Sequence, residues 1–220
     1  MAEPFAVLDC ALISVATGEN AHTLRELRDR LMNTDDPGIM YYHFWDAMLR
    51  PRFVDPEFQN DFSAWAWHDL HDRRLAERLA IVNPADFHYM DDLRHKVIDV
   101  IEDRMEEPDF NPLIHVEYPF FLMRSQIVVF DTGIRIEHPE EMPQRIEKMS
   151  AGSIFYHFID SRRRTESGEN DFSEWLRGIN SQYTDLTDKI AAIDPYFNSL
   201  TELRNQLATI LKAQFAKGGA

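Results

Sequence analysis

The sequence predicts a mainly α-helical protein of two tandem pseudo-symmetric helical repeats, each with about four helices and a short β-strand near its start. One observation is a repeated motif, because Tyr42-His43-Phe44 returns as Tyr156-His157-Phe158. Another is the return of Asn60-Asp61-Phe62-Ser63 as Asn170-Asp171-Phe172-Ser173. The separations nearly agree, at 114 (157 − 43) and 110 (171 − 61). Internal similarity of this kind predicts one structural unit used twice.

The repeats are expected to span residues 5–107 and 118–217, joined by a linker at residues 108–117. The linker holds Pro108 and Pro112. Because it is short, we expect the two halves to pack together.

Each repeat is expected to open with a strand followed by a short helix. Residues 7–15 and 122–130 are rich in Val, Ile, Leu and Phe, and each run ends at a Thr-Gly pair, which predicts strands that stop there. Thr23 and Glu26 form a capping box that starts a helix at Leu24. Pro139 is expected to start the equivalent helix of the second repeat.

Three further helices are expected in each repeat. The second begins near Gly38 and Gly152, and the third extends from each Asn-Asp pair to an Asn-Pro or Asp-Pro pair at residues 83–84 and 194–195. The fourth has apolar residues at three- and four-residue spacing, which indicates one buried helical face. Its members are Met90, Leu93, Val97, Val100, Ile101 and Met105, and then Leu200, Leu203, Leu207, Ile210, Leu211 and Phe215.

The composition limits the class of function. The formal net charge of −15 argues against nucleic acid and against anionic membranes, because both need Lys and Arg. We find no apolar run long enough for a membrane span and no signal peptide. The lone Cys10 suits a reducing compartment, hence a cytoplasmic protein. No phosphate-binding glycine loop, serine-hydrolase elbow or dinucleotide fingerprint occurs.

The first candidate site is a His-x-x-Asp pair on the second helix of each repeat. Residues three apart share a helix face, and a carboxylate can orient an imidazole or share a metal or polar ligand with it. The alternative is a core histidine whose ring nitrogen is satisfied by a carboxylate. With the aromatic residue before each histidine and the Asp of the next helix, the residues are Tyr42, His43, Asp46 and Asp61, and Tyr156, His157, Asp160 and Asp171.

The second candidate is the Asn-Asp-Phe-Ser-x-Trp motif. It either forms the rim of a ligand pocket, with the indole as an apolar platform, or it caps a helix. In the capping interpretation, Asp61 or Asp171 accepts hydrogen bonds from first-turn amides. The other motif residues proposed as ligand contacts are Asn60, Trp65, Asn170 and Trp175.

The third candidate is His68-Asp69-Leu70-His71-Asp72, which with the preceding His43 resembles the HD-type metal-dependent phosphohydrolases. The resemblance covers about thirty residues and lacks the Gly-Lys pair that usually follows. It implies a divalent metal held by His43, His68, Asp69 and His71. The alternative is a solvated polar helix face. A separate run, Arg162-Arg163-Arg164, is expected either to meet a phosphate or acidic partner or to pair with the protein's own carboxylates.

The joined pattern Tyr-His-Phe-Trp, Leu-Arg-Pro-x-Phe and Asn-Asp-Phe-x-x-Trp, followed by Arg73 to Leu79 and Asn83-Pro84, resembles an uncharacterised bacterial family known only as a domain of unknown function. The resemblance covers most of the chain with two tandem copies. The second copy departs from the pattern at Ile159 and over residues 162–169. The resemblance implies a soluble bacterial protein and assigns no catalytic residue.

These observations favour a non-enzymatic cytoplasmic binding or regulatory module that recognises a protein partner or a small polar ligand. It is expected to need no cofactor and to contact neither nucleic acid nor membrane. One alternative is the metal-dependent phosphohydrolase. Another is a structural assembly protein that forms a homo-oligomer.

Overall fold

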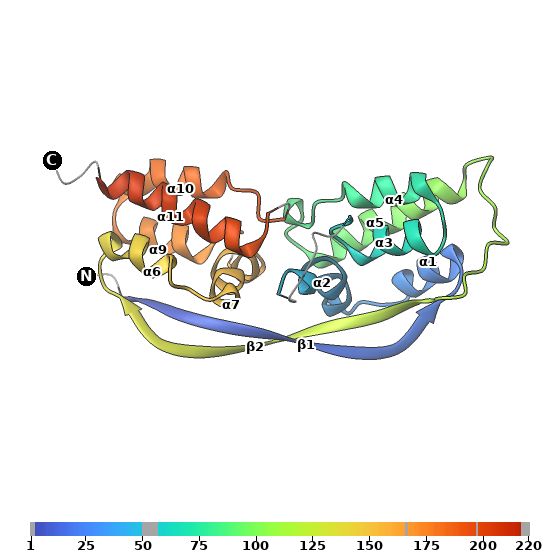
Figure 1. Cartoon of the computed structure of the whole chain (residues 1–220), viewed down its shortest axis with the longest axis horizontal. Coiled ribbons are helices and arrows are strands. Elements are labelled where there is room, and N and C mark those ends of the chain that lie inside the picture. The colour runs from blue at the N-terminus through green and yellow to red at the C-terminus, as the bar shows by residue number, and fades with distance from the viewer. Residues whose placement is uncertain (1–2, 50–56, 166, 197, 217–220) are drawn as a thin grey trace. The chain divides into compact units, whose positions relative to one another are not determined.

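The computed structural model describes residues 3–49, 57–165, 167–196 and 198–216. The chain divides into two compact units (Figure 1). Unit 1 comprises Met1–Ala11 and Ile127–Ala220, and unit 2 comprises Leu12–Gln126. The Leu-Arg-Pro-x-Phe stretch of the family pattern lies largely outside the described residues.

Two long strands, β1 (Phe5–Ala21) and β2 (Phe120–Ile136), form a two-stranded antiparallel sheet. Each strand contributes to both units: residues 5–11 and 127–136 belong to unit 1, and residues 12–21 and 120–126 belong to unit 2. Two threonine side chains fix the register. Thr17 Oγ1 donates to the Leu122 carbonyl at 2.6 Å, and Thr132 Oγ1 donates to the Val7 carbonyl at 2.6 Å.

The predicted fold class, a mainly α-helical pair of tandem repeats with short strands, is wrong. The structure is a mixed α/β fold with 57% helix and a long contact between two strands of 17 residues. The prediction ended each strand at its Thr-Gly pair. Gly18 and Gly133 instead adopt φ values of 83° and 74° within the strands, a conformation that costs glycine little, so each strand continues beyond its glycine.

Unit 2 carries the helices that follow β1. The first begins as predicted, because Thr23 accepts a hydrogen bond from the Glu26 amide. The predicted third helix is in fact two helices, because His71 has φ 55° and Asp72 caps a new helix. The helices are α1 (Leu24–Met32), α2 (Pro37–Trp45), a 3-10 turn (Asp46–Leu49), α3 (Asp61–His68), α4 (Arg73–Ala80), a 3-10 turn (Pro84–Asp86) and α5 (Met90–Met105).

Unit 1 carries the helices that follow β2. Pro139 begins a 3-10 turn as the first helical element, and the motif Tyr156-His157-Phe158 lies in a π-helical stretch. The elements are a 3-10 turn (Pro139–Glu141), α6 (Met142–Ile146), α7 (Ala151–Ile154), a π-helix (Phe155–Asp160), α8 (Ser161–Arg164), α9 (Asp171–Ile179), a 3-10 turn (Ser181–Tyr183), α10 (Thr184–Ala191) and α11 (Leu200–Ala216).

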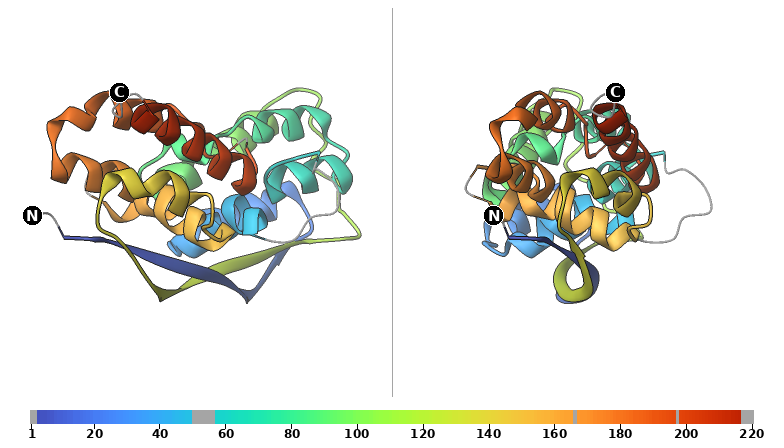
Figure 2. Two further views of the ribbon diagram at one scale, coloured as in Figure 1. Left: turned by 60° about the vertical axis from the view of Figure 1, so that its left-hand side comes forward. Right: turned by 90° about the vertical axis from the view of Figure 1, so that its left-hand side faces the viewer.

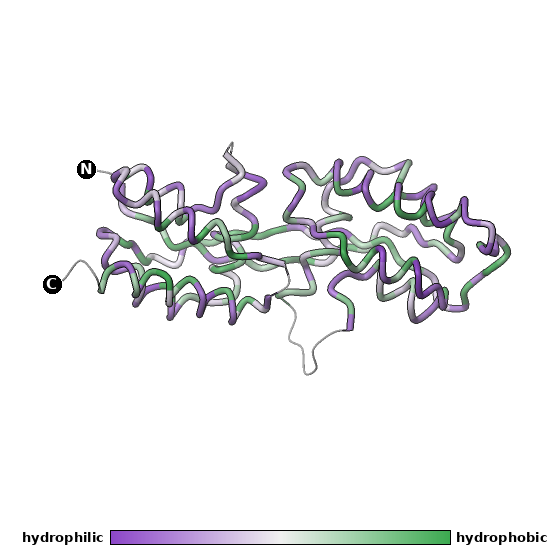
Figure 3. The backbone as a smooth tube through the Cα atoms, turned by 90° about the horizontal axis from the view of Figure 1, so that it is seen from above, coloured by the Kyte–Doolittle hydropathy of each residue, from purple (hydrophilic) through white to green (hydrophobic). Residues whose placement is uncertain are grey.

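The apolar faces predicted for the last helix of each half are confirmed. Figure 3 shows hydrophobic and hydrophilic turns alternating along α11. One face of α5 and of α11 is buried, including Leu93, Val97, Ile101, Leu203, Leu207 and Leu211. Each unit thus has its own apolar core under its helices. Within the described residues, no helix combines the length and apolar character that a membrane span needs.

A glycine at the start of a helix lets that helix approach the sheet in each unit. A Cβ built on Gly152 would lie 2.4 Å from the Cys10 carbonyl oxygen, and one on Gly38 would lie 3.1 Å from the Ser125 carbonyl oxygen. Neither site has room for a larger residue without backbone movement, least of all Gly152. The helices of each unit accordingly lie along one side of its part of the sheet (Figure 2).

Candidate functional site

The histidine of the repeated Tyr-His-Phe motif in unit 2, His43, is buried and joins two helices and a strand, an arrangement called here a histidine tie. His43 Nδ1 lies 2.8 Å from Asp61 Oδ2, and the backbone amide of Met123 donates to His43 Nε2 at 3.2 Å. A backbone N–H can only donate, so Nε2 accepts and the ring proton sits on Nδ1, where it is donated to Asp61. Both ring nitrogens are therefore engaged in hydrogen bonds, and the ring is closed to solvent.

The same arrangement recurs in unit 1. His157 Nδ1 lies 2.7 Å from Asp171 Oδ2, and the Leu8 amide donates to His157 Nε2 at 2.9 Å. His157 is also buried. In both units, the strand residue that meets the histidine lies far from it in the sequence, so each tie fixes a distant strand onto a helix of its own unit.

Aromatic rings surround each histidine. In unit 2 the Phe120 ring centroid lies 4.6 Å from that of His43 and 5.0 Å from that of Phe62. In unit 1, Phe5 takes this place, with its ring centroid 4.8 Å from that of His157. These apolar contacts explain why the histidine needs both of its hydrogen bonds, because an unpaired polar atom there would be costly.

The tryptophans of the Asn-Asp-Phe-Ser-x-Trp motif bind the chain just before each strand. Trp65 Nε1 donates to the Tyr118 carbonyl at 3.2 Å, and Trp175 Nε1 donates to the Glu3 carbonyl at 2.8 Å. The indoles thus anchor the strand starts.

The helix caps fall on the asparagines of the motif, one residue earlier than predicted. Asn60 Oδ1 accepts from the Ser63 amide at 2.9 Å, and Asn170 Oδ1 accepts from the Ser173 amide at 2.9 Å. Asp61 and Asp171 are turned toward the histidines instead. The capping role that the sequence suggested for the aspartates was therefore wrong, because the neighbouring amide side chain is the one in position to accept.

The aspartates of the two His-x-x-Asp pairs bind other groups. Asp46 accepts from Ser125 Oγ at 2.8 Å, and Asp160 accepts from Arg163 Nε at 2.6 Å and Arg164 Nε at 2.8 Å. Both carboxylates are buried. In each unit, the histidine pairs with the aspartate of the Asn-Asp-Phe-Ser-x-Trp motif. The aspartate three residues after the histidine instead accepts hydrogen bonds from a strand serine in unit 2 and from arginines in unit 1.

Arginine 164 extends the histidine tie of unit 1. Its Nη2 donates to Asp171 Oδ2 at 2.9 Å, and its guanidinium carbon lies 4.0 Å from the centroid of the Tyr156 ring. Burial disfavours the charge of this guanidinium, but the Asp171 carboxylate outweighs it and leaves the pKa of Arg164 above its ordinary value. Burial also raises the pKa of Tyr156. Two members of the arginine run, Arg163 and Arg164, thus pair with the protein's own carboxylates, whereas the Arg162 guanidinium lies over the Phe158 ring.

Tyrosine 42 takes the place of Tyr156 in unit 2. Its ring packs edge-on against His43 with 4.9 Å between centroids, and Tyr156 packs on His157 at 5.1 Å. The two histidine ties are similar down to the aromatic side chain before each histidine.

The residues proposed as metal ligands do not gather into a ligand set. His68 ends α3 and packs edge-on against Phe58 at 6.3 Å. His71 follows in a left-handed conformation, and the Asp69 amide donates to the Trp65 carbonyl. Over the described ranges, no three His, Cys, Asp or Glu side chains are arranged to hold a metal ion.

The sequence did not indicate the surface that now stands out in unit 1. All residues from 128 to 135 of β2 are exposed. The β2 patch comprises Val128, Val129, Phe130 and Ile134, whose exposed fractions are 42%, 39%, 49% and 42%. Adjacent strand residues point to opposite faces, so Val129 and Phe130 show that neither face of this stretch is covered. Strand propensity was visible in these residues, but their exposure was not.

The comparisons with other proteins concern family and fold. The solved structure of OrfY from Thermoproteus tenax is similar to this chain, with a TM-score of 0.81, 25% sequence identity, and coverage of 96% of this chain and 95% of that chain. No curated protein matches the sequence. Residues 2–212 match the family model described as "Family of unknown function (DUF5752)", which confirms the predicted resemblance to a family known only by such a description. The chain therefore belongs to the DUF5752 family of unknown function.

Proposed function

We propose that the protein is a non-enzymatic cytoplasmic binding module that recognises a partner protein through the β2 patch of unit 1. The observation that carries the proposal is the exposure of Val128, Val129, Phe130 and Ile134 in one strand. Contiguous exposed apolar side chains are rare on monomeric proteins and usually mark an interaction surface.

The backbone of β2 offers a second means of recognition. Within the described residues the sheet contains β1 and β2 alone, so each strand has an outer edge of amide and carbonyl groups. An extended segment of a partner can add to such an edge, with backbone hydrogen bonds giving affinity and side-chain contacts giving specificity. The β2 patch would supply the apolar contacts on both faces.

The charge of the chain limits the partner. At a net charge of −15, an acidic partner or a second copy of the chain would be repelled, whereas a basic partner would be attracted. The partner is therefore a protein with an apolar extended segment flanked by Lys or Arg. The cytoplasmic assignment rests on Cys10, a buried single thiol that suits a reducing compartment.

The histidine ties support the non-enzymatic part of the proposal. A general base needs a ring nitrogen within reach of a substrate proton. His43 and His157 each have both nitrogens bonded inside the unit, one of them to a backbone amide. Their geometry suits a structural role.

The test is photo-crosslinking in the cells that make the protein, with p-benzoylphenylalanine placed at Phe130. The matched control carries the same photoreactive residue at Ile81, an apolar side chain that is 77% exposed in unit 2. We expect one discrete adduct from position 130 and none from position 81. The adduct is then identified by mass spectrometry, and the partner is purified for a binding titration.

In that titration, the double variant Val128→Ser, Phe130→Ser should bind the partner at least about ten-fold more weakly than the natural chain. Its urea midpoint should stay nearly unchanged, because substitutions of exposed side chains cost little stability. Equal crosslinking from positions 130 and 81, an adduct with a second copy alone, or full affinity in the double variant would each contradict the proposal.

A further inference from the structure

Unit 2 contains a cleft of about 460 Å³ that the proposed function does not use. It opens between the two strands, the end of α1 and the start of α2. Its volume falls within the range of roughly 300–1,000 Å³ that is typical of small-molecule sites. The residues of the cleft that matter here are Val15, Glu19, Arg30, Asp36, Ile39, Leu122 and Arg124.

Part of the lining of the cleft is apolar. Ile39 and Leu122 are among the lining residues and belong to the unit 2 core. Val15 of β1 adds a half-buried apolar side chain. A ligand with an aliphatic body would bury apolar surface against these side chains.

Arg124 and Asp36 form an oppositely charged pair in the lining of the cleft. Arg124 Nη1 lies 3.7 Å from Asp36 Oδ2, which is longer than a hydrogen bond. Asp36 Oδ1 accepts from the Gly38 amide at 2.8 Å and caps α2, so the carboxylate is held by its other oxygen. In the part of the chain that the structure describes, the Arg124 guanidinium donates no hydrogen bond.

The Arg124–Asp36 interaction is weak enough for a ligand to replace it. A half-exposed pair of this kind contributes little to the stability of a protein, so little is lost when a ligand inserts its own charges. The second pair in the cleft is already closed, because Arg30 Nη1 lies 2.8 Å from Glu19 Oε2. Arg30 and Glu19 therefore neutralise each other in the lining of the cleft. The more widely spaced Arg124–Asp36 pair is the recognition site.

We propose that this cleft binds a free amino acid with an aliphatic side chain. Its carboxylate would take a bidentate hydrogen bond from the Arg124 guanidinium, and its ammonium group would bind Asp36 Oδ2. The two charges of an α-amino acid are separated by a single carbon atom, which suits two opposite charges that lie close together. The side chain would rest on Ile39 and Leu122.

Unit 1 provides an internal contrast. At the corresponding helix start, Ser150 takes the capping place of Asp36, and Asp9 lies beside Gly152 as Arg124 lies beside Gly38. The same backbone arrangement there lacks the arginine-aspartate pair. The proposal therefore predicts one amino-acid site per chain.

The experiment is isothermal titration of the full chain with L-leucine. Two probes separate the charges: 4-methylpentanoate has the carboxylate without the ammonium group, and 3-methylbutylamine has the ammonium group without the carboxylate. We expect one leucine per chain, and binding of either half-probe at least about ten-fold weaker. The variants are Arg124→Gln and Asp36→Asn, the second chosen because asparagine also caps a helix. The control is Arg135→Gln, an exposed β2 arginine in unit 1.

Both cleft variants should weaken leucine binding at least about ten-fold, and the control should leave it unchanged. Circular dichroism melts of the same samples show whether each variant is folded. Absence of heat with leucine, isoleucine and valine at millimolar concentration overturns the proposal. So does equal binding of 4-methylpentanoate and leucine, or unchanged leucine binding by folded Arg124→Gln.

Discussion

His43 Nδ1 lies 2.8 Å from Asp61 Oδ2, and this contact joins two helices whose connecting segment lies partly outside the described residues. Because the opposite ring nitrogen accepts from the Met123 amide, one imidazole holds α2, α3 and β2 together. The histidine therefore contributes to stability through both nitrogens.

Replacement of this histidine should destabilise the protein strongly. His43→Ala leaves the Met123 amide without its acceptor and opens a cavity between aromatic rings, at a cost of about 3 kcal/mol. Urea denaturation followed by circular dichroism measures it. His95→Ala is the control, because His95 is exposed on α5; that variant should stay within about 0.5 kcal/mol. Equal losses in both variants would argue against the tie.

The glycine that meets the sheet in unit 1 should not tolerate a side chain. Gly152→Ala places a Cβ 2.4 Å from the Cys10 carbonyl oxygen, and backbone must move to relieve the clash, at a cost of about 2 kcal/mol. Gly178→Ala is the matched control, because a Cβ there meets nothing within 4 Å and the residue lies in α9. We expect that control to gain up to about 1 kcal/mol. Thermal melts of the two variants should therefore shift in opposite directions.

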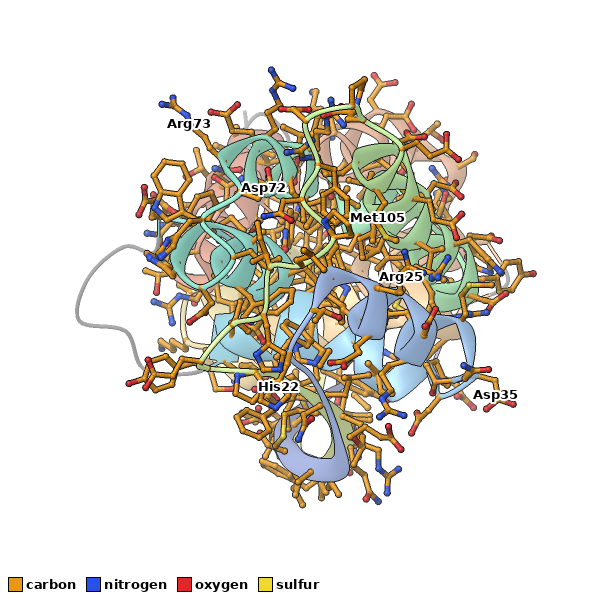
Figure 4. The ribbon with its side chains drawn as sticks, turned by 90° about the vertical axis from the view of Figure 1, so that its right-hand side faces the viewer. His22, Arg25, Asp35, Asp72, Arg73 and Met105 are labelled. Carbon is orange, nitrogen blue, oxygen red and sulfur yellow. The ribbon has the colours of Figure 1, made fainter. Side chains whose placement is uncertain are left out.

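The buried arginine of α5 should matter far more than an exposed one. Arg104 Nε donates to Asp72 Oδ2 at 2.7 Å, and Arg104 Nη1 donates to Glu107 at 2.7 Å. Asp72 precedes α4, and Figure 4 shows it at the same end of unit 2 as Met105, the last residue of α5. Arg104→Ala leaves the largely buried Asp72 carboxylate without its cationic partner and should cost about 3–5 kcal/mol.

The control for that variant is Arg73→Ala. Arg73 pairs with Glu77 one helical turn away, and its side chain is 76% exposed. Such a pair contributes only about 0.3–0.5 kcal/mol. Urea midpoints of the two variants should thus differ widely, and a mild effect of Arg104→Ala would show that the network around Asp72 is dispensable.

Alkaline pH should weaken the fold through Cys10. Burial, assisted by Asp160 and Asp9, raises the pKa of this thiol from 9.0 to about 12. A group whose folded pKa is raised contributes stability that is present below the unfolded pKa and lost as pH rises toward the folded value. Above about pH 9, the free energy of unfolding should fall by up to about 1.4 kcal/mol per pH unit from this group.

The control is Cys10→Ala, in which this part of the pH dependence should vanish while that of other groups remains. Urea titrations from neutral to alkaline pH compare the two chains. Reaction with a disulfide reagent gives a second measurement. The native thiol should react slowly because little thiolate is present, and the urea-unfolded thiol should react fast. Fast reaction of the native chain would contradict the raised pKa.

The helix starts could be predicted because their signals are local. Thr23 caps α1, and the apolar spacing from Leu93 to Ile101 marks the buried face of α5. The strand lengths could not be predicted, because Gly18 suggests the end of a strand in the sequence but lies within the strand in the structure. The third helix was misjudged because the left-handed residue His71 carries no breaker signal of its own.

The candidate site could be predicted only in part. His43 and Asp61 are 18 residues apart and were placed in one candidate set, where the structure joins them. The other partner of the ring is a backbone amide 80 residues away. Every residue but proline has such a donor, so no side-chain pattern could single out Met123.

The sharing of the strands has a consequence during synthesis on the ribosome. Unit 2 consists of Leu12–Gln126, so every one of its segments has been made once residue 126 has been added. Unit 1 draws its first segment from Met1–Ala11 and the rest from Ile127–Ala220. Residues 5–11 must therefore wait, without their strand partners, until residues 127–136 have been made before unit 1 can close.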